Sequence, residues 1–456
     1  MDIEKRNREL EDSDRRFIWH PFTQMQEWEQ DRPIVIDEGR DCFIRDTYGR
    51  WYLDGVSSLW VNIFGHRKKE IDDAIKAQID RISHSTMLGL SNVPAIQLAE
   101  RLVSFIGRSF GPSLNRVFYS DNGSTAVEVA LKMAFQYWQH MGRKKKTSFL
   151  CLNNAYHGDT LGAVSVGGVD IFHETFGPLL FKTYKAPSPY CYRCDLGTDH
   201  HECGISCADK MEEILKTHHE EIAAVIIEPL VQAAGGMIVS PPGYLKKVRE
   251  LCIKYDVLLI ADEVATGFGR TGRMFACEHE GVSPDIICLS KGITGGYLPL
   301  AVTIATDQIY RAFLGEFREL KTFFHGHSYT GNPLACAAAL ACLDIFENEK
   351  IIENMLPKIA LLEDWLKGLN DLPHVGNTRS SGLMAGVELV EDKETRSPYA
   401  WEEKMGWKVA YHARDNGVII RPLGNVVVLM PPLSISIGNL TQMLKVIRDA
   451  IIASTS

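Results

Sequence analysis

The sequence of 456 residues contains no apolar run long enough to cross a lipid bilayer, which needs about 20 residues. Its longest apolar runs, such as Val257–Ala261, are far shorter. The charged segment Met1–Arg16 lacks the apolar stretch of a secretory signal, so we expect a cytoplasmic protein. In that compartment the 11 cysteines are expected to be reduced thiols rather than a disulfide framework.

An excess of basic residues is also absent. The 49 lysines and arginines are outnumbered by 58 acidic residues, giving a net charge of -9, and the short run Arg143–Lys146 is interpreted as a solvated turn. This balance disfavours a nucleic-acid partner. The sequence has no internal repeat or low-complexity linker, and its 45% hydrophobic and 23% charged residues are typical of a globular protein. Its length favours two lobes, or one large domain with extensions, over a single typical domain.

The middle of the chain, from about Arg101 to Thr306, alternates short apolar runs with helical patterns such as Ser124–His140. Several of the runs show no polar alternation, as expected for strands buried on both faces. This order predicts an α/β fold with a mainly parallel sheet covered by helices. The predicted strands are Arg116–Ser120, Ser148–Leu152, Ala223–Glu228, Leu258–Asp262, Asp285–Leu289 and Leu300–Ala305.

The two ends of the chain differ from the middle. Before about Ile75 the sequence contains short strand-like pieces, and after about Ile351 helices flank further apolar segments. We interpret the ends as one smaller α+β domain, with residues 1–75 and 346–456 in it and residues 76–345 in the large domain. The strand-like pieces are Cys42–Asp46, Trp51–Asp54, Gly382–Val390, Val418–Arg421 and Asn425–Met430.

A first candidate binding segment follows the strand that ends at Ser120 and opens a helix. Gly123 lets the backbone approach a ligand closely, and Ser124, Thr125 and the free N–H groups of the helix could bind a phosphate. Ordinary helix capping by Asn122 is the alternative.

A second candidate lies where two apolar strands end. Asp262 falls at the carboxyl end of its strand, where open α/β sheets bind ligands, and such a carboxylate needs a cationic partner. That partner could be a protonated pyridine nitrogen or, alternatively, Arg270 or Arg273. Lys291 follows the next strand at the start of a glycine-rich turn, where burial would lower the pKa of its amine and make it nucleophilic. An ordinary surface lysine is the alternative, but together the two residues could flank one ring.

Two further segments fit a planar, phosphorylated cofactor. Tyr156 could stack on the ring, and His157 could be a general base or a packing histidine. Ser328 could add a phosphate contact or belong to an ordinary loop. It precedes a helix that Asn332 is expected to cap, with Pro333 at the first position.

These segments together resemble the class III aminotransferases of fold type I, and the resemblance runs from about Trp19 to Pro432. It implies pyridoxal 5'-phosphate as the cofactor and a large domain with a mainly parallel seven-stranded sheet. The motifs that carry it are Asp121–Ala126, Tyr156–Asp159, Ile227–Gln232, Ala261–Gly272 and Ser290–Gly296.

Within the class, the sequence is most similar to the branch that converts 8-amino-7-oxononanoate to 7,8-diaminononanoate in biotin biosynthesis. The alternatives are another class III activity, on an ω-amino acid, acetylornithine or 4-aminobutyrate, and a non-enzymatic cofactor-binding regulator. The residues that carry the closer resemblance are Trp19–Thr23, Asp54–Ser58, Phe275–His279, Ile420–Gly424 and Met430–Pro432.

Carried over residue by residue, the resemblance implies that Lys291 bonds to the cofactor as an imine and then shuttles the substrate proton. It implies that Asp262 pairs with the pyridine nitrogen and that Tyr156 stacks on the ring. His327 and Ser328 match a segment that reaches the phosphate from a partner subunit, which implies a homodimer. The implied phosphate ligands are Gly123 and Ser124, and the implied substrate contacts are Phe22, Trp60, Asp159, Gly326 and Arg421.

The identity of the amino donor depends on departures from the pattern. Members that use S-adenosylmethionine usually carry Tyr in place of Phe22, a second Trp in place of Leu59, and Tyr in place of Val428. Their absence removes groups that could stack on or hydrogen-bond to that donor. We therefore favour L-lysine as the donor, with S-adenosylmethionine as the alternative.

Four cysteines are spaced as zinc ligands often are. Cys191 and Cys194 form C-x2-C, and Cys203 and Cys207 form C-x3-C. Transamination needs no metal, and the segment matches a variable insertion of the family. We expect no metal site, with structural zinc as the alternative.

Overall fold

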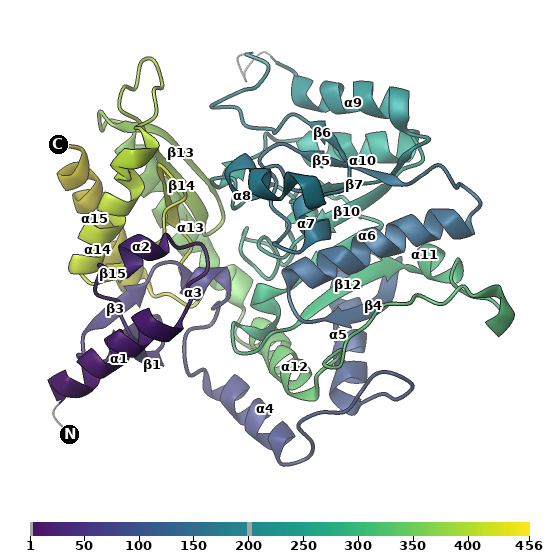
Figure 1. The fold of residues 1–456 in the computed structure, drawn as a ribbon, viewed down its shortest axis with the longest axis horizontal. Coiled ribbons are helices and arrows are strands. Elements are labelled where there is room, and N and C mark those ends of the chain that lie inside the picture. Colours follow the sequence, from purple (N-terminus) through teal and green to yellow (C-terminus); the bar gives the residue numbers. More distant parts are fainter. Residues whose placement is uncertain (1–2, 198–202) are drawn as a thin grey trace.

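The computed structural model describes residues 3–197 and 203–456, and its largest element is a seven-stranded sheet at the centre of Figure 1. The strand order is β4-β12-β11-β10-β7-β5-β6. All neighbours are parallel except at β12, which is antiparallel to both β11 and β4, so the predicted mainly parallel seven-stranded sheet is confirmed. The strands are β4 (Leu114–Ser120), β5 (Ser148–Leu152), β6 (Tyr184–Ala186), β7 (Ile222–Ile227), β10 (Leu258–Asp262), β11 (Ile286–Leu289) and β12 (Ala301–Thr306).

Helices cover both faces of this sheet (Figure 1). Alternate residues of β10 show the two faces: Leu258 and Ile260 pack in the cluster that contains α6, and Leu259 and Ala261 pack in the cluster that contains α5 and α10. This is why the strand reads as one continuous apolar run. The helices of this part are α4 (Lys69–Ile79), α5 (Val93–Phe110), α6 (Gly123–His140), α7 (Leu161–Ser165), α8 (Asp170–His173), α9 (Ser206–His218), α10 (Tyr244–Lys254), α11 (Asp307–Arg311) and α12 (Pro333–Asn348), with 3-10 turns η1 (Glu174–Leu179), η2 (Ala276–Glu280), η3 (Lys291–Thr294) and η4 (Phe317–Glu319).

Local sequence explains where two of these helices begin. The Asn122 side chain accepts the Thr125 N–H at 3.1 Å and starts α6, while the Asn332 side chain accepts two N–H groups and starts α12 with Pro333 at its first position. None of the helices in the described part of the chain has the length and apolar composition that a bilayer crossing requires.

The chain ends meet on the left of Figure 1. β3 (Trp51–Asp54) pairs in parallel with β15 (Val418–Ile419), which joins remote ends of the sequence in one sheet of order β1-β2-β3-β15. Both predicted domain boundaries fall inside helices, α4 and α12, so the division of the chain stays a prediction. The remaining elements are α1 (Ile3–Phe17), α2 (Met25–Trp28), β1 (Ile36–Arg40), β2 (Phe43–Asp46), α3 (Ser57–Trp60), α13 (Ile351–Leu369), β13 (Val375–Ser381), β14 (Met384–Leu389), η5 (Trp401–Glu403), α14 (Met405–Asp415), β16 (Val426–Leu429), α15 (Ile437–Thr455) and the hairpin β8 (Val231–Gln232) and β9 (Ile238–Val239).

Candidate active site

Lys291 lies where the sequence predicts it, three residues beyond Cys288, which is paired with Asp262 across β10 and β11. Its backbone is left-handed, with φ of 48°, and its Nζ lies 4.8 Å from the centre of the Trp60 ring. Burial lowers the pKa of Lys291, while nearby Asp262 and Glu228 act in the opposite direction. No carboxylate in the described residues forms an ion pair with Nζ, so the amine is available for covalent chemistry.

Asp262 is buried and held from two sides. Its Oδ2 lies 2.7 Å from His157 Nδ1, and its Oδ1 accepts the Val264 N–H at 3.0 Å. Neither arginine that was considered as its partner contacts it: Arg270 donates to the carbonyls of Trp60, Asn62 and Pro431, and Arg273 donates to the carbonyl of Glu278. The alternative that Arg270 or Arg273 is the partner of Asp262 is therefore wrong. The side chain that contacts the Asp262 carboxylate is His157.

Glu228 was not predicted as a site residue, although it directly follows the fully buried strand β7, and Asp262 likewise stands at the carboxyl end of β10. Its two carboxyl oxygens accept the N–H groups of Tyr156, at 3.0 Å, and Ala233, at 2.9 Å. Burial raises the pKa of Glu228 to about 7, and the charge of Asp262 acts in the same direction. Glu228 therefore holds the backbone of Tyr156 in place.

The Tyr156 segment and the start of α6 lie against each other. The Tyr156 hydroxyl donates to Asp159 Oδ2 at 2.8 Å, and the Asp159 N–H donates to Ser124 Oγ at 3.2 Å. Burial raises the pKa of the Tyr156 phenol, and Asp159 adds to this. At Gly123 a Cβ atom would lie 2.6 Å from a methyl group of Val264, so a larger residue would displace the segment that follows Asp262. The structure thus brings the predicted residues Tyr156 and Asp159 next to the predicted residues Gly123 and Ser124 at the start of α6.

Trp60 ends a short left-handed turn. Its own φ is 72°, and Ser57, Ser58 and Leu59 before it also have positive φ, although none is glycine. Such runs are costly for L-residues, so outside contacts must hold this one. Asp54 accepts the Ser58 N–H and hydroxyl, and the fully buried Arg270 donates to the Trp60 carbonyl. Trp60 is thereby buried beside Lys291.

The predicted substrate contacts Phe22 and Arg421 lie together although 399 positions separate them. Arg421 Nη2 donates to the Phe22 carbonyl at 3.4 Å, and no carboxylate in the described parts of the chain pairs with Arg421. Burial lowers the pKa of its guanidinium. The Phe22 ring lies 5.3 Å from the ring of Phe172 on α8, and Phe172 lies 6.2 Å from the Tyr156 ring. Phe172, which the sequence did not single out, connects the two groups.

Gly326, His327 and Ser328 lie in the segment between α11 and α12. His327 Nδ1 is 3.4 Å from Asp121 Oδ2, just before α6, while Gly326 and Ser328 are exposed. The single chain therefore brings this segment to the start of α6, but it does not test a contact with a partner subunit.

The four closely spaced cysteines are half-buried, and Cys191 interacts electrostatically with both Cys203 and Cys194. Across residues 3–197 and 203–456, no group of three or more His, Cys, Asp or Glu side chains is arranged to hold a metal ion. All 11 cysteines are among the described residues, and none forms a disulfide. Zinc binding by this cluster stays an untested alternative.

Comparisons with known proteins agree with this geometry. The family described as "Aminotransferase class-III" matches residues 24–451. The adenosylmethionine-8-amino-7-oxononanoate aminotransferase of Geobacter sulfurreducens is 58% identical over 428 residues, which cover 94% of each chain.

Solved structures agree as well. The crystal structure of the enzyme of the same name from Methanocaldococcus jannaschii superimposes with a TM-score of 0.93 at 48% identity, covering 98% of this chain and 99% of that one. An amine transaminase from an uncultivated Pseudomonas species, solved with PLP bound, has a TM-score of 0.91 at 39% identity, covering 96% and 99%.

The family match spans the large sheet and most of the paired chain ends, and includes Asp262 and Lys291. The fold is that of the fold type I enzymes, the cofactor is pyridoxal 5'-phosphate, and the reaction is a transamination. The chain belongs to the class III aminotransferases.

Proposed function

We propose that this protein transfers an amino group to 8-amino-7-oxononanoate and so forms 7,8-diaminononanoate in biotin biosynthesis. The observation that carries the proposal is that the amine of Lys291 and the guanidinium of Arg421 both lack a carboxylate partner in the described structure, although burial lowers the pKa of each. Relatives that are 50–58% identical carry the name of this activity. The names of these relatives support the reaction, and the roles of individual residues are our assignments.

The residues fit the cofactor. Burial lowers the pKa of the Lys291 amine, which has no ion pair in the described structure, and the buried Nε2 of His157 has no hydrogen-bond partner there. Gly123 lets the start of α6 pack closely against Val264, two residues after Asp262. When bound, pyridoxal phosphate withdraws electrons from the carbon that bears the amino group. In our assignment Asp262 keeps the pyridine nitrogen protonated, Ser124 and the start of α6 bind the phosphate, and Lys291 moves the proton at the substrate carbon.

His157 orients this arrangement. Its bond to Asp262 fixes the carboxylate in one direction, so Asp262 needs no rearrangement to meet the ring nitrogen. Tyr156, held at its backbone by Glu228 and at its hydroxyl by Asp159, presents its ring as the stacking surface.

Arg421 is our assigned site for the substrate carboxylate. A guanidinium that burial has partly desolvated gains most from a carboxylate, because both charges are then satisfied by a paired hydrogen bond. The Phe22 and Phe172 rings beside it are apolar and would accompany the methylene chain of the keto substrate. The Trp60 ring, beside Lys291, would contact the substrate next to the amine.

We propose L-lysine as the amino donor. Phe22 lacks a hydroxyl, Leu59 is 52% exposed, and the buried Val428 offers no polar group, so stacking and hydrogen-bonding groups for an adenine are few. Adenosylmethionine, which stands in the names of the relatives, is the second candidate.

We also propose a homodimer with a shared site and a cytoplasmic location. The segment before α12 exposes large apolar side chains: Phe324 is 72% and Tyr329 61% exposed, and Leu88, 69% exposed, lies beside Gly326. A second copy of the chain covering this surface would bury them and bring Ser328 to the phosphate site. The absence of disulfides among the 11 cysteines supports the location.

Two experiments test the proposal. The chain should restore growth without biotin to a bacterium that lacks its own 8-amino-7-oxononanoate aminotransferase, and failure with good expression would reject the biotin assignment. In a single turnover, lysine should convert the bound pyridoxal phosphate to the pyridoxamine form. Conversion by adenosylmethionine but not by lysine would replace our choice of donor.

A further inference from the structure

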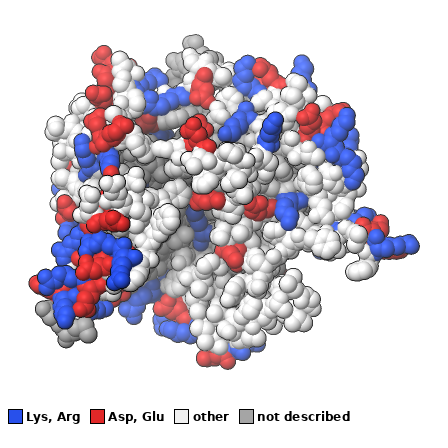
Figure 2. Space-filling view, viewed as in Figure 1, with Lys and Arg blue, Asp and Glu red and all other residues white. Residues whose placement is uncertain are grey.

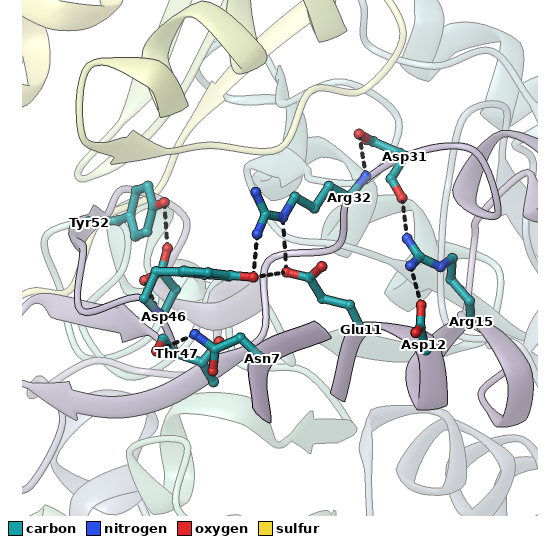
Figure 3. Close-up of polar contacts among 10 residues, drawn as sticks. Asn7, Glu11, Asp12, Arg15, Asp31, Arg32, Asp46, Thr47 and Tyr52 are labelled. Atoms are coloured by element: carbon teal, nitrogen blue, oxygen red, sulfur yellow. Dashed lines mark hydrogen bonds and ion pairs between the residues drawn. The ribbon is translucent and has the colours of Figure 1, made fainter. Parts of the chain in front are cut away.

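The N-terminal helix α1 is anchored to the sheet that joins the chain ends. Asn7 and Glu11 are buried, unlike the rest of the helix, whose charged surface lies at the lower left of Figure 2. The Asn7 amide donates to the Thr47 carbonyl at 2.9 Å, and Glu11 accepts from Tyr48 at 2.9 Å and from Arg32 at 3.0 Å (Figure 3). These contacts give α1 one fixed position.

One turn further along, Asp14 ties the following segment back to the helix. Its carboxylate lies 3.0 Å from His20 Nε2 and accepts the Trp28 Nε1 hydrogen at 2.9 Å. The rings of His20 and Trp28 lie 4.2 Å apart, so the three side chains form one packed cluster. The Asp14 side chain is only 15% exposed, and two hydrogen-bond partners from remote positions converge on it.

Phe22 follows this cluster closely in the chain. Phe22 stands two residues after His20 with φ of 50°, a left-handed conformation that a non-glycine residue adopts only when its surroundings hold it. From there its ring reaches Phe172 of α8 and its carbonyl accepts from Arg421. The segment therefore spans the site from the side of Arg421 to the side of Tyr156.

We propose that Asp14 is a positioning residue that determines how the enzyme binds its keto substrate. It holds the segment from His20 to Phe22 as one wall of the substrate site and keeps the Phe22 carbonyl on Arg421, which fixes the guanidinium for the substrate carboxylate. Asp14 touches neither substrate nor cofactor, and the inference rests on the proposed role of Phe22 and Arg421.

Asp14→Ala in the full-length holoenzyme tests this, with Asp12→Ala as the matched control. Asp12 lies on the same helix but is exposed and contacts only Arg15 among the described side chains. We expect Asp14→Ala to raise KM for 8-amino-7-oxononanoate about 3- to 10-fold with kcat within about twofold, because it removes hydrogen bonds of the wall and none of the reacting groups. Asp12→Ala should match the wild type in both constants, and the absorbance of bound cofactor should be unchanged in all three.

A second variant and a second readout cover the other outcomes. Trp28→Phe removes the N–H that Asp14 accepts but keeps an aromatic ring, and should raise KM in the same direction. Amide hydrogen exchange over residues 18–24 should quicken in Asp14→Ala and not in Asp12→Ala, with or without substrate turnover. Unchanged exchange, or a fall in kcat with constant KM, would overturn the role of Asp14. A wild type that does not turn over the keto substrate would instead reject the proposed function, and the exchange result would still decide the inference.

Discussion

The carboxyl edge of the large sheet and the exposed segments around Phe22 and Ser328 hold their candidate site residues in different ways. Asp262 is the last residue of β10 and Lys291 lies two residues beyond β11, so main-chain pairing between these strands sets their places. Phe22 contacts Arg421, nearly 400 positions away, through its carbonyl, and Ser328 is exposed in the single chain. The main chain of the sheet therefore fixes the positions of Asp262 and Lys291, whereas the positions of Phe22 and Ser328 are expected to depend on contacts with residues remote in the sequence or on another chain.

This difference predicts a graded response to substitution. A change at the sheet edge should remove chemistry, because no neighbouring group can replace a side chain in that place. A change on an exposed segment should weaken binding and leave the chemistry in place.

The largest effect is expected at Lys291. Lys291→Ala should lower the rate of amino transfer by about 10⁴-fold or more, because we assign the amine as both nucleophile and proton carrier. Lys350→Ala is the matched control, since Lys350 is also left-handed, with φ of 49°, but is exposed. Borohydride reduction and peptide mapping should label Lys291 in the wild type. A label on another lysine would remove the basis of the assignment.

A smaller loss is expected from Asp262→Asn. The substitution keeps the shape of the side chain but removes the charge that would hold the pyridine nitrogen protonated, so kcat should fall roughly 10²–10³-fold. Asp256→Asn is the control, because Asp256 precedes the opposite end of the same strand and its side chain is 64% exposed. Equal losses in the two variants would show that the carboxyl edge has no special role.

The sequence was sufficient to predict much of the sheet edge. Strands such as β10, buried on both faces, leave continuous apolar runs, and six strands of the large sheet follow from them. The seventh, β6, has only three residues and a mixed pattern, and β13 is mostly polar and half-buried, so neither leaves such a signal. The sequence also predicts that the carboxylate at the end of β10 has a partner, because a buried carboxylate requires one, and the structure places His157 beside it.

Partners that lie far apart in the chain could not be predicted in the same way. His157 bonds Asp262 across 105 positions, and nothing in the local sequence distinguishes that role from packing. Phe172 lies on a four-residue helix with no periodic pattern. Glu228 could have been found, since it follows β7 by the same rule that indicated Asp262.

Glu228 offers a test of the sheet edge through pH. Its pKa is raised from 4.5 to about 7, so the folded protein retains a proton that the unfolded chain has already released, and stability falls as pH rises between these values. The loss that belongs to this group is on the order of 3 kcal/mol. Unfolding free energies measured from pH 4.5 to 7.5 should decline less in Glu228→Gln than in the wild type.

The exposed Glu29→Gln serves as the control for that series and should follow the wild type. The slope with pH is compared rather than the absolute stability, because Gln cannot accept both amide hydrogen bonds that Glu228 accepts. Parallel curves for Glu228→Gln and the wild type would mean that Glu228 ionises as an ordinary carboxyl.

The smallest effect is expected at Ser328, on the exposed segment before α12. If a partner subunit brings this hydroxyl to the phosphate, Ser328→Ala should weaken cofactor binding only about 3- to 10-fold, the cost of one hydrogen bond, and leave kcat at saturating cofactor unchanged. The exposed Ser113→Ala should have no effect. Equilibrium titration of the apoenzyme with pyridoxal phosphate, with sedimentation to establish the assembly, measures this. Unchanged affinity in a dimer would remove Ser328 from the phosphate ligands, and a monomer that binds the cofactor fully would show that one chain completes the site alone.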